Sequence, residues 1–105
     1  MDTLANLEQT IAARSGADPA SSYVAKLNAR GIPVIARKLG EEAVEAVVAA
    51  LAEDRGELVG EAADVLFHLI VLLQAKGIPL SDVMAELDRR EGVSGLDEKA
   101  SRGSD

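Results

Sequence analysis

The sequence predicts an all-α protein built as a single helical domain. Apolar residues recur at helical spacing in several segments, and no segment shows the alternation of apolar and polar residues that is typical of a strand. The 105 residues favour one domain, and the core must be built from Ala, Val, Leu and Ile because the chain has one Tyr, one Phe and no Trp. A chain this short buries a modest share of its surface, so we expect further burial between subunits.

The first two predicted helices are short. One covers TLANLEQTIAAR, in which apolar residues recur at i, i+3 and i+7, and a Ser-Gly pair ends it. After the loop ADPASS, the second helix covers YVAKLNAR. Gly31 closes this helix, because glycine is the commonest residue just beyond a helix end.

Two longer helices follow, joined by the turn DRG. The first opens with Pro33, which the first turn of a helix tolerates, and runs to about Asp54. The second runs from about Glu57 to Lys76. The two are therefore expected to form a long antiparallel pair.

The last predicted helix lies in IPLSDVMAELDRREG, with Ser81 as its expected N-cap. Residues 1–92 then form the single domain. Residues 93–105 form a polar tail rich in small residues, which we expect to be irregular and partly mobile.

The composition excludes several classes of function. The net charge of −7 disfavours nucleic-acid binding, which depends on Lys and Arg at phosphates, and the absence of Cys excludes disulfides, zinc thiolates and thiol catalysis. The longest apolar run, VLFHLIVLL, is shorter than the roughly 20 residues that span a bilayer. No signal peptide is visible at the N-terminus. We expect a cytoplasmic protein with neither nucleic acid nor membrane as a partner.

Glu42 and Glu45 form a first carboxylate pair, on the helix that opens with Pro33. They lie opposite a bulky apolar stripe, an arrangement typical of a solvated acidic face. Their neighbours Ala46 and Ala49, however, would allow another helix to approach closely. We therefore expect this helix to be buried on two faces. The apolar stripe consists of Val44, Val47, Val48 and Leu51.

Glu61 and Asp64 form a second pair, and His68 continues their stripe on the following helix. Residues 65–73 are apolar all round except for His68, which predicts a buried helix. An unpaired charge at the edge of a core is costly, and a bound cation would compensate it. Carboxylates suit a hard cation such as Mg²⁺.

The expected hairpin gives a further test of this hypothesis. A turn near Arg55 places Glu45 level with Val65 and offsets Glu42 from Glu61 by about 10 Å along the helix axis. Long side chains, a tilted crossing or two metal ions would close that gap. Facing carboxylates do build metal sites in helical bundles. Spacing alone leaves both a metal site and a structural acidic face open.

The order of these segments resembles a known superfamily. EEAVE followed by EAAD fits the EExxE…ExxD pattern of the MazG-type all-α nucleoside triphosphate pyrophosphohydrolases. Within it, nearly the whole chain is similar to the phosphoribosyl-ATP pyrophosphohydrolase family, through SSYVAKL, RKLGEEAVE, EAADVLFHLIVLL and REGVSGLDEKASR. Val24 departs from the pattern, because Thr is expected there, and the change removes a hydroxyl from a candidate phosphate-binding stretch.

The resemblance implies a Mg²⁺-dependent cut between the α and β phosphates of 1-(5-phosphoribosyl)-ATP, with Mn²⁺ able to substitute. The products would be 1-(5-phosphoribosyl)-AMP and pyrophosphate, as in the second step of histidine biosynthesis. Glu42, Glu45, Glu61 and Asp64 match the superfamily's metal-ligand positions, and Glu41 would support the ligands or position the attacking water. The resemblance also implies a homodimer or larger assembly of helical bundles.

Ser22, Tyr23 and Lys26 are the candidates for binding the additional phosphoribosyl group. A purely structural interpretation also fits, since Ser21 or Ser22 could simply cap the helix that starts near Tyr23. The two roles are compatible.

Four further side chains each have two interpretations. Lys38 either contacts a phosphate oxygen or pairs with Glu42 one turn away. His68 is interpreted as a buried neutral histidine bonded to a neighbour, rather than as a ligand, because Mg²⁺ prefers oxygen. Lys99 and Arg102 either close over the substrate or are simply solvated.

Two other functions stay open at this point. One is a MazG-type house-cleaning enzyme that removes non-canonical nucleotides, against which the SSY segment and the SGLDEKASR tail argue. The other is a non-catalytic helical oligomerisation module with an acidic surface.

Overall fold

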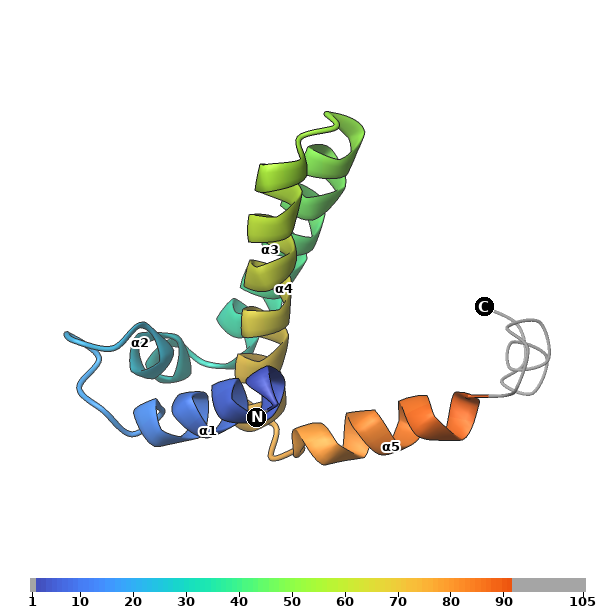
Figure 1. Ribbon diagram of the computed structural model, residues 1–105. Helices are drawn as coiled ribbons and strands as arrows, with labels where there is room; N and C mark the ends of the chain where they lie inside the picture. The colour runs from blue at the N-terminus through green and yellow to red at the C-terminus, as the bar shows by residue number, and fades with distance from the viewer. Residues whose placement is uncertain (1, 92–105) are drawn as a thin grey trace.

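The computed structural model describes residues 2–91, in which five α-helices and no strand are found. The predicted all-α class is confirmed. The helices are α1 (Thr3–Arg14), α2 (Tyr23–Arg30), α3 (Ile32–Leu51), α4 (Arg55–Ala75) and α5 (Leu80–Arg90) (Figure 1). The expected C-terminal tail, with Lys99 and Arg102, lies outside the described residues.

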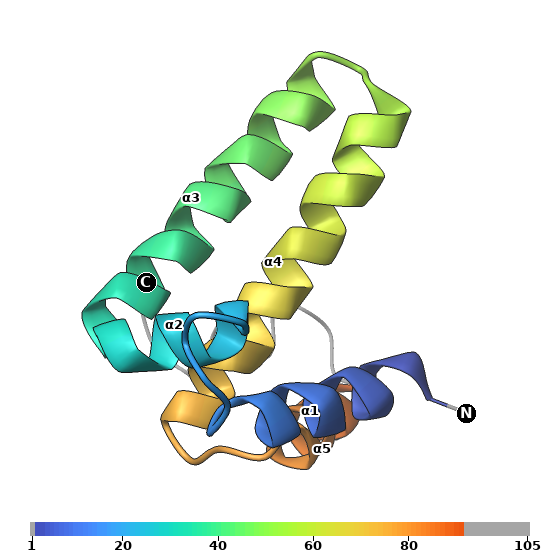
Figure 2. The same cartoon turned by 90° about the vertical axis from the view of Figure 1, so that its left-hand side faces the viewer.

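Helices α3 and α4 form the long antiparallel hairpin that dominates the molecule (Figure 2). Helix α3 ends at Leu51, and Glu53 takes a left-handed conformation with φ 59°. Asp54 then caps α4, because its side chain accepts a hydrogen bond from the Glu57 backbone N–H at 2.9 Å. The prediction that α3 continues to Asp54 and that α4 begins near Glu57 is therefore wrong. Asp54 stabilises a helix start, so the turn is centred on Glu53.

Helices α1 and α2 pack against the base of this hairpin and form the core with it. Both helices begin and end as predicted. Asp2 is the N-cap of α1 and Ser22 is the N-cap of α2, and Gly31 after α2 takes φ 95°. The buried residues of the core cluster come from all four helices. They are Ile11, Val24, Leu27, Ile35, Ile70 and Val71.

The outer half of the hairpin has no such cover within the chain. On α3 the predicted apolar stripe is exposed at Val44 (62%), Val47 (58%), Val48 (60%) and Leu51 (80%). On α4 the prediction of all-round burial is wrong at Leu66, although Ile70 and Val71 are buried. The physical reason is reach: α1 and α2 cover only the base of the hairpin.

Helix α5 leads away from the base of the hairpin (Figure 1). Its N-cap is Pro79, so the prediction of Ser81 as N-cap is wrong. Proline offers no side-chain acceptor, and the cap comes instead from α1: the Glu8 carboxylate accepts a hydrogen bond from the Leu80 N–H at 2.6 Å. A carboxylate is also favoured here by the positive end of the helix dipole.

Helix α4 is the one described helix that is long and apolar enough to cross a bilayer, with a mean hydropathy of 1.7 over 18 residues. The core helix of a soluble protein passes the same test. Here α4 packs along α3 and against α1, and it carries carboxylates at Glu57, Glu61 and Asp64. One such helix is weak evidence for a membrane span, and 17% of its apolar window is buried within the chain.

The Glu8 cap leads to a prediction about stability. Glu8→Ala removes the acceptor for the first N–H of α5 and is expected to lower the free energy of unfolding by about 1 kcal/mol. Urea denaturation measures this change. The control is Gln9→Ala at the next, exposed position, which should stay within about 0.5 kcal/mol of the wild type. An equal loss in both variants would argue against the cap.

Candidate active site

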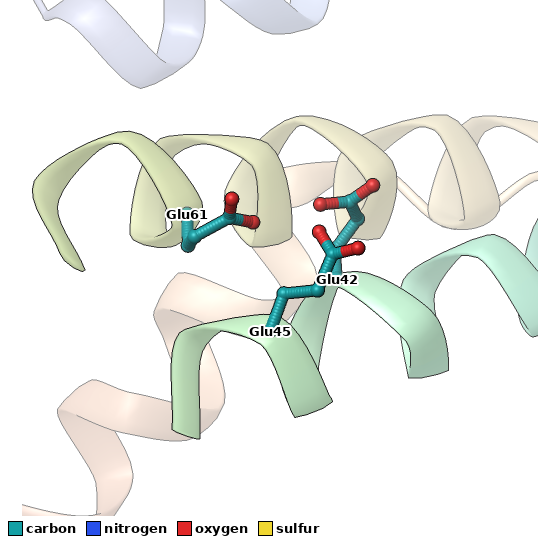
Figure 3. A group of neighbouring side chains, drawn as sticks. All are labelled: Glu42, Glu45 and Glu61. Carbon is teal, nitrogen blue, oxygen red and sulfur yellow. The ribbon is translucent and has the colours of Figure 1, made fainter. Parts of the chain in front are cut away.

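Three carboxylates converge between α3 and α4 (Figure 3). Glu42 and Glu45 project from α3 towards Glu61 of α4, and one carboxylate oxygen from each lies within 4.8 Å of the others. Like charges this close disfavour full ionisation unless a cation lies among them. We call these three residues the carboxylate cluster.

The turn explains how the cluster forms. Moving its centre from Arg55 to Glu53 moves the residue expected level with Glu45 from Val65 to Glu61. The predicted axial offset of about 10 Å between Glu42 and Glu61 is therefore wrong, and the three side chains meet without a second metal ion or a strongly tilted crossing.

Glu61 lies in the most demanding environment of the three. It is half-buried, and its Oε2 is shielded from solvent with no hydrogen-bond partner among the described residues. Burial, followed by the close approach of the Glu42 and Glu45 carboxyl groups, raises the pKa of Glu61 from 4.5 to about 7. Ionised carboxylates only accept hydrogen bonds, so carboxyl groups this close attract each other only when one of them carries a proton.

A cation fits the same place as that proton. A buried, unpartnered carboxylate oxygen facing two more carboxylates is an all-oxygen donor set, and hard divalent cations such as Mg²⁺ or Mn²⁺ prefer such donors. The half-buried setting strengthens the attraction relative to a fully solvated acidic face.

Asp64 does not join the close group. Its side chain is exposed, and its backbone carbonyl accepts a hydrogen bond from His68 Nδ1 at 2.7 Å. It lies one helical turn after Glu61 on α4, so its role as a fourth ligand stays a prediction.

Glu41 also points elsewhere. It forms ion pairs with Lys38 at 3.4 Å and with Arg37 at 3.7 Å. Lys38 therefore pairs with Glu41 and not with the predicted Glu42, because the Glu42 side chain points towards Glu61. The role of Glu41 in positioning water stays a prediction.

His68 is 5% exposed and is bonded on both ring nitrogens, which confirms its interpretation as a buried histidine bonded to its neighbours. The Asp64 carbonyl can only accept, so Nδ1 carries a proton. In the neutral ring, Nε2 then accepts a hydrogen bond from the Tyr23 hydroxyl, at 2.9 Å. This bond connects α2 to α4.

Two other residues predicted to bind the phosphoribosyl group, Ser22 and Lys26, lie close to Tyr23 in the sequence, at the start of α2. Ser22 caps α2, accepting from the Ala25 N–H at 3.2 Å, which confirms the structural interpretation. Lys26 is exposed on the same helix. Val24 is buried in the core at 3% exposure. The expected Thr hydroxyl would therefore lie in a packed part of the core.

Sequence reasoning missed two residues near this segment. The Phe67 ring stacks on that of Tyr23, with centroids 6.1 Å apart and an angle of 22° between the planes. Arg14, at the end of α1, lines a hollow with Ser22 and Tyr23. Phe67 stood out only as one more apolar residue of the helix predicted to be buried, and Arg14 belonged to none of the motifs that the sequence analysis used.

A family model described as phosphoribosyl-ATP pyrophosphohydrolase matches residues 4–91. The chain belongs to the phosphoribosyl-ATP pyrophosphohydrolase family. A phosphoribosyl-ATP pyrophosphatase of Erythrobacter litoralis is 67% identical over 103 residues, covering 98% of this chain and 99% of the relative. Those of Rhizorhabdus wittichii and Dinoroseobacter shibae are 67% and 60% identical, covering 95% and 97% of this chain and 94% and 100% of the relatives.

These similarities agree with the predicted membership in the phosphoribosyl-ATP pyrophosphohydrolase family and its all-α superfamily. The matched residues contain α1 to α5, so they include both the carboxylate cluster and the segment around Tyr23.

The raised pKa of Glu61 predicts how stability depends on pH. Its folded pKa of about 7 lies above the ordinary 4.5, so the folded state binds more protons between these values. The free energy of unfolding of the metal-free protein should therefore fall as pH rises from about 4.5 to about 7. Glu61→Gln should reduce this fall. Urea denaturation near pH 5 and pH 8 with a chelator present measures both.

Glu57→Gln, one turn earlier on α4, is the matched control and should retain the wild-type pH dependence. A wild-type stability that does not change over this range would contradict the proposed repulsion in the cluster.

Proposed function

We propose that this protein hydrolyses phosphoribosyl-ATP to phosphoribosyl-AMP and pyrophosphate, the second step of histidine biosynthesis, with Mg²⁺ held by the carboxylate cluster. The observation that carries the proposal is the convergence of Glu42, Glu45 and Glu61 around a shielded, unpartnered oxygen, in a chain that matches the phosphoribosyl-ATP pyrophosphohydrolase family from α1 to α5.

The proposed role of each residue in the reaction follows from its charge. Glu42, Glu45 and Glu61 would hold the cation, with Asp64 one turn further along α4 as the proposed fourth ligand. The cation, when bound, neutralises phosphate charge and activates a water. Glu41, held by Lys38 and Arg37, is the proposed support for the ligands or for the attacking water.

The proposed substrate contacts come from α3 and from the start of α2. Lys38, with its side chain 33% exposed, would contact the polyphosphate, and Ser22, Tyr23 and Lys26 would bind the phosphoribosyl group. Lys99 and Arg102 keep their predicted role of closing over the substrate.

A second copy of the chain is the proposed partner. Monomeric proteins rarely expose large contiguous apolar patches, yet Val44, Val47, Val48 and Leu51 form one on α3. A homodimer or higher homo-oligomer that covers this stripe would complete a bundle around the hairpin. Histidine biosynthesis also supports the proposed cytoplasmic location.

The test of the activity is pyrophosphate release. With Mg²⁺ the wild type should hydrolyse phosphoribosyl-ATP with a higher kcat/KM than ordinary or modified dNTPs, and preference for a dNTP would favour the house-cleaning alternative. Glu61→Gln should lower kcat/KM by roughly 100-fold or more, since residues that only support metal ligands already cost about 10–100-fold. The matched control, Glu57→Gln, should retain activity.

A thermal shift with Mg²⁺ or Mn²⁺ separates the enzyme from the non-catalytic alternative. The wild type should be stabilised by the cation and Glu61→Gln less so. If neither protein responds, the oligomerisation module becomes the better description.

The oligomer is tested by Val48→Lys, which places a charge in the exposed stripe. Sedimentation velocity should show the wild type as a dimer or larger species and this variant shifted towards monomer, because burying an unpaired charge is costly. Thr10→Lys, at an exposed position of α1, is the control and should leave the assembly unchanged. A monomeric wild type would contradict the proposal.

A further inference from the structure

A hollow of about 440 Å³ lies where the end of α1 meets the start of α2, away from the carboxylate cluster. It combines a guanidinium, two hydroxyls and an aromatic wall. These groups come from Arg14, Ser21, Ser22, Tyr23 and Phe67. We call it the Arg14 pocket.

The charge of this pocket is opposite to that of the chain. The net charge is −7, yet no carboxylate of residues 2–91 lines the hollow. Among residues 2–91 no ion pair is found for Arg14, whereas Arg37 and Lys38 each contact Glu41. The start of α2 adds the partial positive charge of a helix N-terminus. The pocket therefore suits an anion.

Hydrogen bonds hold these groups in place. The Ser22 hydroxyl donates to the Arg14 carbonyl at 3.4 Å while accepting from the Ala25 N–H at 3.2 Å. One side chain thus ties the last residue of α1 to the start of α2. This hydrogen bond places the backbone of Arg14 beside the N-terminus of α2.

The aromatic wall is held equally firmly. The Tyr23 hydroxyl is bonded to buried His68, and the Tyr23 ring stacks on Phe67. Because 46% of Tyr23 is exposed, the wall presents an apolar surface beside the guanidinium. A flat or sugar-like group that ends in an anion would contact both.

The Arg14 pocket lies further along the hairpin than the carboxylate cluster, towards its base. His68, which holds Tyr23, follows Glu61 by seven residues on α4, a rise of about 10 Å. In phosphoribosyl-ATP, two riboses and a purine separate the phosphate chain from the 5′-phosphate of the added ribose. A substrate cut at the cluster must therefore extend well along the hairpin towards its base.

We propose that Arg14 binds the 5′-phosphate of the phosphoribosyl group and so selects this substrate over ordinary nucleotides. This inference rests on the proposed function and adds to it a residue that neither the motif nor its spacing indicated. Arg suits the task because its planar donors can bind two phosphate oxygens together.

The test compares two substrates, phosphoribosyl-ATP and the same molecule without the 5′-phosphate. Arg14→Gln should raise KM for phosphoribosyl-ATP by about 10- to 100-fold, as expected for losing a hydrogen bond to a charged group. The kcat should change little, because the phosphate is bound equally in ground and transition states. For the dephosphorylated substrate, the variant and the wild type should have the same KM.

Arg30→Gln is the matched control, since it removes the same charge at the other end of α2, and it should leave both KM values unchanged. Arg14→Lys should fall between the wild type and Arg14→Gln, and it also serves if the glutamine variant does not fold. An equal rise in KM for both substrates, or the same rise in Arg30→Gln, would overturn the inference.

Binding of ribose 5-phosphate, followed through the amide resonances of Ser22 and Tyr23, gives a readout that needs no turnover. Wild-type shifts that Arg14→Gln abolishes support the inference, and their absence in the wild type overturns it. If these shifts occur but phosphoribosyl-ATP is not hydrolysed, the proposed function fails while the anion site stands.

Discussion

The register between α3 and α4 is the constraint on which the rest of the structure depends. It is determined by one short turn, in which Glu53 takes a left-handed conformation and the Asp54 side chain caps α4. A shift of two residues in this turn would separate Glu61 from Glu45 by roughly a helical turn along the axis. The cluster and the shielded oxygen of Glu61 both follow from this register.

The cluster is a source of local instability that the fold tolerates. Glu42, Glu45 and Glu61 approach within 4.8 Å, and the cost appears in the raised pKa of Glu61. A binding site that is destabilised without its ligand is common at functional positions, because the ligand then relieves the repulsion as it binds. The base of the hairpin, packed with α1 and α2, supplies the stability that the outer half lacks.

The same division separates the two ends of the proposed substrate. The cluster is acidic and suits a cation, whereas the Arg14 pocket is cationic and suits a phosphate. The bond between Tyr23 and His68 joins them, since His68 shares α4 with Glu61 and Tyr23 lines the pocket. One site on the hairpin and one of opposite charge at the junction of α1 and α2 favour a long ligand with a metal-bound phosphate at one end and a second phosphate at the other.

Local sequence patterns determined most of the secondary structure. The helical periods around Leu4 to Ile11 and across α3 and α4, the cap at Ser22 and the glycine after α2 were all predictable, because each depends on residues a few positions apart. The family motif likewise pointed to Glu42, Glu45, Glu61 and Asp64, of which the first three meet. Prediction failed at the turn between α3 and α4, where the local cap by Asp54 was missed, and at α5, whose cap comes from Glu8 of α1 and not from Ser81.

By itself, then, the sequence determined an all-α hairpin with acidic pairs on its two long helices, and a family resemblance. Only the tertiary structure decided which carboxylates meet, that Asp64 lies outside the close group, and that Glu41 takes Lys38. It also placed Arg14 beside Tyr23, although the two are separated by a loop. The physical reason is that helical spacing specifies only the face on which a residue lies, whereas contacts between helices depend on register and on how far each neighbouring helix reaches.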